Sequence, residues 1–147
     1  MEYEVVNLDE KIVAGVSART SNDAPDMGSV IGELWNKLYQ GGIGAGIKNK
    51  VNTYAIGLYS DYEGDSYCVT AGNEVSSKEG NEGVSLKVIP AGRYAKFLVH
   101  GDMMTVVAQA WEEIWKTPLD RSYKADFEEY LNADAQNADV ALYISLN

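Results

Sequence analysis

The sequence is poor in the residues that build metal sites and catalytic triads. It contains one histidine, His100, and one cysteine, Cys68, among 147 residues. A zinc site uses several such ligands and a Ser-His-Asp hydrolase needs a partnered histidine, so both are nearly excluded. We therefore expect no metal and no cofactor. Cys68 is interpreted as a small buried strand residue, and because it cannot form an internal disulfide, a reducing cytoplasm is the expected location.

Long apolar runs and clustered positive charge are also missing. No stretch approaches the about 18 apolar residues of a membrane span, and two of the first four residues are glutamate, unlike the positively charged start of a signal peptide. Twelve Lys and Arg against 22 Asp and Glu give a net charge of −10. Phosphate binding needs clustered Lys and Arg. We expect neither a membrane nor a nucleic acid as a direct partner.

Tyrosine and tryptophan, by contrast, are abundant. Ten tyrosines and three tryptophans stand beside two phenylalanines. Both residue types combine an apolar ring with a polar group and suit a surface that contacts a ligand, although tyrosine is also favoured in half-exposed strands. Composition alone leaves both interpretations open. The length and the 46% apolar content are those of one soluble domain.

The order of predicted elements occurs twice, over about residues 1–77 and 83–147. Helical periodicity covers residues 26–40 and 103–116. Strands are expected at residues 3–6, 11–20, 54–59, 66–75, 84–90, 92–100, 126–131 and 139–146. We predict an α+β fold in which two duplicated βαββ units share one antiparallel sheet, with both helices on one face and a cleft between them.

Two segments resemble functional loops but lack the required context. The glycine-rich stretch at residues 42–46 follows a helix and precedes a strand, which is the wrong order for a nucleotide-binding loop, so we interpret it as a flexible connector. The acidic stretch at residues 61–65 lacks the ligand spacing of an EF-hand and is interpreted as a solvated hairpin tip.

The two halves supply matching aromatic residues. Trp35 and Tyr39 on the first helix correspond to Trp111 and Trp115 on the second. Tyr59 in the first half corresponds to Tyr130 in the second half, two residues after the position where Gly57 corresponds to Glu128. The predicted ligand-binding residues are Glu128, Tyr130, Tyr59, Trp35, Trp111, Tyr39, Trp115 and Gly57.

A carboxylate among aromatic rings is suited to an organic cation, since the ring faces and the negative charge both attract positive charge. Glu128 and Tyr130 share one face of the predicted strand. Periodicity also permits Glu129 as the pocket carboxylate, because it alternates with apolar Phe127 and Leu131. In the plainer alternative, Glu128 is solvated and the tryptophans form an ordinary core between helices and sheet.

Four segments resemble the GyrI-like family, which is also found as the effector-binding domain of AraC-type and multidrug-sensing transcription regulators. They are residues 57–63, 88–94, 110–115 and 126–131. The resemblance extends over nearly the whole chain and is especially clear for small members on mobile gene cassettes. It implies an aromatic cleft with a buried glutamate that binds bulky, often cationic and lipophilic compounds. The family's glutamate falls on Glu128 and its tyrosine on Tyr130.

Three functions follow as hypotheses. The first is a small-molecule binding protein for cationic amphipathic ligands, without the DNA-binding module of the full-length regulators. The second is a metal-independent hydrolase with Glu128 as general base and Tyr130 as proton donor or oxyanion partner. The third is a module that binds a protein such as gyrase through its acidic surface.

Overall fold

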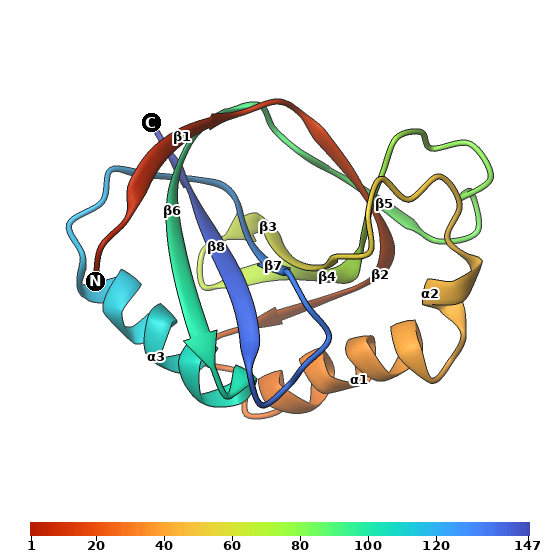
Figure 1. Ribbon diagram of the computed structural model, residues 1–147, viewed down its shortest axis with the longest axis horizontal. Coiled ribbons are helices and arrows are strands. Elements are labelled where there is room, and N and C mark those ends of the chain that lie inside the picture. Colours follow the sequence, from red (N-terminus) through yellow and green to blue (C-terminus); the bar gives the residue numbers. More distant parts are fainter.

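The computed structural model describes all 147 residues as an open antiparallel sheet with helices on one side (Figure 1). The sheet has eight strands in the order β1-β6-β8-β7-β3-β4-β2-β5. The strands are β1 (Glu4–Leu8), β2 (Lys11–Ser21), β3 (Ala55–Glu63), β4 (Ser66–Val75), β5 (Ser85–Ile89), β6 (Gly92–Gly101), β7 (Arg121–Tyr130) and β8 (Ala138–Leu146). The helices are α1 (Met27–Tyr39), α2 (Ile43–Gly46) and α3 (Met103–Lys116). The predicted α+β fold is confirmed.

The strand order is symmetric about its centre. If β1, β2, β3 and β4 are exchanged for β5, β6, β7 and β8, the order is the same when it is read from the opposite edge. Strands β3 and β7 lie side by side at the centre, and β5 and β1 form the two edges. The first strand of each half pairs with the second strand of the other half, β1 with β6 and β5 with β2. This exchange ties the two halves together beyond the central strand pair β3–β7. Duplication of the sequence itself stays a prediction.

Three apolar clusters explain how the two long helices and the edge strands pack on the sheet. Leu34 and Leu38 of α1 pack on the half of the sheet built by β2 and β4, and Ala110 and Ile114 of α3 pack on β6 and β8. The third cluster contains Phe127 and Ile89 of edge strand β5, and residues of edge strand β1 pack against it. It contains no residue of either long helix. Figure 1 shows α1 and α3 together on one side of the sheet. None of the helices has the length and apolar content that crossing a membrane requires.

The structure corrects several predicted boundaries. β7 begins at Arg121 rather than at residue 126. The prediction missed the start of the strand because a register shift between Arg121 and Asp126 interrupts the pairing with β8 and hides the alternating pattern. In the acidic stretch at 61–65, residues 61–63 still belong to β3, and the turn of the hairpin consists of Gly64 and Asp65. Residues 43–46 form the single turn α2 rather than a flexible connector, and Gly42 enters it with a φ of 78°.

Candidate ligand-binding site

Glu128 lies on the central strand pair of the sheet, near the C-terminal end of β7 and directly opposite Gly57 on β3. These are the two positions that correspond in the predicted repeat, so the symmetry relates them across the central strand pair. A Cβ added to Gly57 would lie 3.1 Å from Oε1 of Glu128 and 3.3 Å from Cζ2 of Trp35. The missing side chain therefore provides the space that the carboxyl group occupies.

The Glu128 carboxyl group accepts hydrogen bonds from both halves of the chain. Oε1 accepts from the Tyr130 hydroxyl at 2.7 Å. Oε2 accepts from Nε1 of Trp111 at 2.7 Å and from the Tyr59 hydroxyl at 3.2 Å. The residue is 3% exposed, and none of the protein's five ion pairs includes it. Glu128 is thus a buried acid that has donors but no cationic partner.

Burial controls the acid–base state of this group. Loss of solvent raises the pKa of Glu128, and the hydrogen bonds from Trp111, Tyr130 and Tyr59 act in the opposite direction with smaller effect. Burial, followed by the nearby Glu128 charge, also raises the pKa of Tyr59 and Tyr130. Both hydroxyls therefore keep their protons at neutral pH and can act as donors.

Aromatic side chains form two groups, one on each side of Glu128. On one side, the Trp35 ring contacts Tyr130 edge-on at 5.6 Å between centroids and stacks on Tyr39 at 6.0 Å. On the other side, Tyr59 contacts Trp111 edge-on at 5.4 Å. Trp115 lies next to Trp111 at 6.4 Å. The outermost rings, Tyr39 and Trp115, are 65% and 60% exposed, so they form the outer walls of the two groups.

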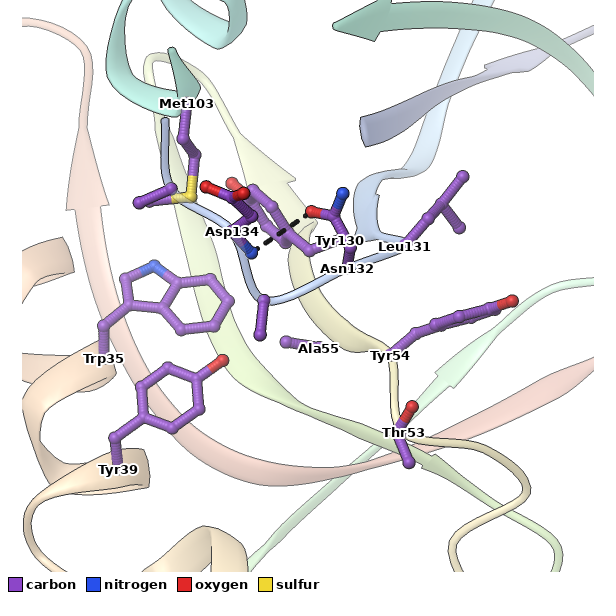
Figure 2. A pocket seen from close by; sticks show the side chains of 12 residues that line it. Trp35, Tyr39, Thr53, Tyr54, Ala55, Met103, Tyr130, Leu131, Asn132 and Asp134 are labelled. Carbon is purple, nitrogen blue, oxygen red and sulfur yellow. Dashed lines mark hydrogen bonds between the residues drawn. The ribbon is translucent and has the colours of Figure 1, made fainter. Parts of the chain in front are cut away.

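The first pocket opens beside Trp35 and Tyr39 and has a volume of about 590 Å³. Figure 2 shows these two rings facing Tyr130 and the loop that follows β7. Loop residues 131–135 form one wall, and Met103 and residues 53–55 complete the lining. Tyr130 separates the pocket from Glu128, because its ring lines the pocket and its hydroxyl bonds the carboxyl group.

Charge in the first pocket is negative. Asp134 is the only Asp, Glu, Lys, Arg or His that lines it. Backbone hydrogen bonds from Asn137 and Gln136 lower the pKa of Asp134, which keeps this exposed carboxylate ionised at the pocket mouth. The pocket thus combines an apolar aromatic lining with a carboxylate at the mouth and a second one behind Tyr130.

Glu129, the alternative carboxylate, lies away from the aromatic groups. It alternates with Glu128 along β7 and is half-buried among Lys11, Glu74 and Lys96. Burial raises its pKa, with the two lysines acting in the opposite direction. The structure therefore brings Glu128, and not Glu129, together with the predicted tyrosines and tryptophans.

A second buried carboxylate was not predicted. Asp126 is fully buried two residues before Glu128, and its Oδ2 accepts from Arg121 at 2.7 Å and from the Tyr62 hydroxyl. Its Oδ1 accepts from the backbone N–H of Ser145 at 3.0 Å. The i, i+2 spacing from Glu128 could have indicated Asp126, but the irregular start of β7 concealed the pairing with Arg121.

Comparisons with known proteins place the sequence in a family. The sequence matches the GyrI-like small molecule binding domain over residues 1–147. The chain belongs to this family. No protein among those with curated functions matches this GyrI-like chain.

Solved structures share the GyrI-like fold over nearly the full chain. SAV2435 bound to tetraphenylphosphonium has a TM-score of 0.85 and 17% identity, covering 100% of this chain and 94% of its own. An integron cassette protein from the mobile metagenome of Vibrio cholerae has a TM-score of 0.74 and 28% identity, covering 97% and 95%. A protein from Staphylococcus aureus MU50 that is proposed to act in bacterial transcription regulation has a TM-score of 0.76 and 18% identity, covering 99% of both chains.

Proposed function

We propose that this GyrI-like domain binds small, lipophilic organic cations in the space between α1 and α3, with Glu128 as the charge partner. One observation carries the proposal: Glu128 is a buried carboxyl group, surrounded by aromatic rings, to which the protein supplies no cation. A ligand cation would complete the ion pair while its apolar groups contact the rings. The binding of tetraphenylphosphonium by SAV2435 supports the same ligand class.

Access to Glu128 requires a change at Tyr130. A cation entering the first pocket meets the Tyr130 ring first, and that hydroxyl occupies Oε1 of Glu128. Rotation of the tyrosine would expose Oε1 while Trp111 and Tyr59 continue to hold Oε2. The ligand would replace a neutral donor with a full positive charge in a site of low polarity, where charge pairing is strongest.

Binding is better supported than hydrolysis. Three side-chain donors bond the Glu128 carboxyl group, and each of these hydrogen bonds lowers the pKa of Glu128 and so weakens it as a general base. The raised pKa of Tyr130 makes this hydroxyl a weaker acid, which is the wrong direction for a proton donor. Turnover of phenyl acetate that disappears in Glu128→Ala would instead favour the hydrolase.

The test compares a cation with its neutral isostere. The pair is (4-hydroxyphenyl)trimethylammonium, called the probe cation below, and 4-tert-butylphenol, called the neutral probe. In Glu128→Gln we expect the Kd of the probe cation to rise about 30-fold, which corresponds to about 2 kcal/mol for a desolvated charge contact. The Kd of the neutral probe should change less than about threefold. Isothermal titration calorimetry at constant salt measures both.

Glu129→Gln is the matched control. It makes the same chemical change one residue away, where the side chain lies away from the aromatic groups. This variant should bind both probes with the affinity of the wild type. An equal loss of affinity for cation and neutral probe in Glu128→Gln would rule out the charge-pairing role.

A further inference from the structure

A second cavity lies at the other end of the space between α1 and α3. Its volume is about 870 Å³, and its aromatic lining includes Tyr59, Tyr67, Trp111, Trp115 and Tyr123. We call it the second pocket. It shares no lining residue with the first pocket.

The two pockets use corresponding residues of the two helices. Trp35 and Tyr39 of α1 and Met103 of α3 line the first pocket. Trp111 and Trp115 of α3 and Met27 of α1 line the second, each 76 positions from its counterpart. Both ends of the space thus have two helix aromatics on one side and a methionine on the other, which is the form expected of a binding surface present twice.

Glu128 contacts a wall of each pocket through a different oxygen. Oε1 accepts from Tyr130, which lines the first pocket. Oε2 accepts from Trp111 and Tyr59, which line the second. One buried carboxyl group therefore lies behind both pockets, and each pocket is one side chain away from it.

The second pocket also favours cations. The exposed carboxylates Asp23, Asp65 and Glu112 line it. Its one basic residue, Arg121, is already paired with buried Asp126 at 2.7 Å. An anion would find no free positive charge there, whereas a cation would find aromatic faces and acidic groups.

We propose that the second pocket binds a second small aromatic cation, and that the two sites are negatively coupled because both use the charge of Glu128. The inference rests on the proposed function, since it requires a cation in the first pocket. A cation in either pocket neutralises the single negative charge of Glu128. The resulting ion pair attracts a second cation only weakly. The coupling is reciprocal, so either site weakens the other by the same factor. Neutral ligands do not need the charge and fill the pockets independently.

The test counts ligands and compares affinities. Native mass spectrometry and calorimetry with the wild type should show two probe cations per chain, the second bound at least about tenfold more weakly than the first, within the usual range of coupling between sites. The neutral probe should fill two sites of similar affinity. In Glu128→Gln the first cation should bind at least about tenfold more weakly, and the two cation affinities should become similar.

Filling each pocket separately assigns the sites. Ala108 lines the second pocket and Ala133 the first, and both are exposed, so a tryptophan at either position occupies its pocket without entering the core. Ala108→Trp should remove one of the two bound cations, and Ala133→Trp should remove the other. In each variant only one cation should bind, and the titration should show no second, weaker binding step.

The outcomes separate this inference from the proposed function. A single cation per chain whose binding is unchanged by Ala108→Trp overturns the second site and leaves the proposed function standing. Two cations of equal affinity in the wild type overturn the coupling. Absence of any cation binding overturns the inference and the proposed function together. The wild-type count needs no variant, so a variant that fails to fold does not affect it.

Discussion

At the scale of single residues, one acid and one glycine control the centre of this protein. Glu128 and Gly57 face each other across the central strand pair, and the carboxyl group fills the space that a side chain at Gly57 would take. Two large side chains could not share this position, because each would need the same volume next to Trp35. A two-fold arrangement of strands therefore holds an asymmetric site at its centre.

The buried acid makes folding stability depend on pH in a defined direction. The pKa of Glu128 is raised above its ordinary value of 4.5, mainly by burial. Its contribution to the free energy of unfolding is therefore greatest below the unfolded pKa and is lost as pH rises through the folded pKa. Glu128→Gln removes this loss. The difference in unfolding free energy, variant minus wild type, should increase with pH above about 4.5, by up to about 1.4 kcal/mol per pH unit.

Urea unfolding of both proteins between about pH 4 and pH 8 measures this difference. Other titrating groups cancel because they are common to the two chains. A difference that stays constant over the whole range would show that Glu128 ionises in the folded protein as it does in the unfolded chain.

Gly57 provides the second residue-scale prediction. An alanine methyl group would lie 3.1 Å from Oε1 of Glu128 and 3.3 Å from Trp35, so one of them must shift. We expect Gly57→Ala to lower the unfolding free energy by about 1–2 kcal/mol, as overpacked sites do. Gly32→Ala is the control with the opposite sign, since its added Cβ meets nothing within 4 Å and helix propensity favours alanine by about 1 kcal/mol. Equal effects of both changes on thermal unfolding would contradict the steric argument.

At the scale of elements, the two helices that border the pockets begin differently. Asp102 caps α3, because its side chain accepts from the backbone N–H of Thr105 at 3.2 Å. Asp26 precedes α1 with no side-chain hydrogen bond to the helix. Helix α1 also contains Gly28 and Gly32, which lower helix stability. We infer that α1 is the more easily displaced of the two pocket walls.

The cap difference can be measured with a matched pair of substitutions. Asp102→Ala should lower the unfolding free energy by about 1 kcal/mol, the usual cost of losing an N-cap. Asp26→Ala should change it by less than about 0.5 kcal/mol, because no side-chain bond is lost. Urea unfolding gives both values. A larger effect at Asp26 than at Asp102 would show that the caps do not distinguish the helices.

At the scale of the whole molecule, a buried polar cluster joins the two halves beside the central strand pair. Asp126 of β7 is bonded to Tyr62 of β3 and to the Ser145 backbone of β8. It also forms the only ion pair in the protein with a fully buried member, to Arg121, whose side chain is 14% exposed. Such a pair contributes little on balance, but removing one partner leaves the other charge uncompensated.

Asp126→Asn tests this role. The amide keeps a similar shape but leaves the Arg121 guanidinium without a counter-charge, so we expect a loss of about 3 kcal/mol in unfolding free energy. Asp61→Asn is the matched control, because Asp61 forms an ion pair with Lys87 in which both side chains are partly exposed. There the loss should be below about 1 kcal/mol. Similar losses in chemical unfolding for both variants would show that burial of the pair is unimportant.

The sequence by itself determined the fold class, the two long helices and the choice of aromatic residues. Apolar spacing records which face of an element is buried, and it located α1 and α3 to within a residue or two. It did not determine that Gly57 and Glu128 are direct partners, that Arg121 pairs with Asp126, or that the loop at 131–135 closes a pocket. These facts depend on strand register, on the irregular start of β7 and on contacts between distant segments. Only the tertiary structure decides them, because local periodicity carries no information about which distant residues share a space.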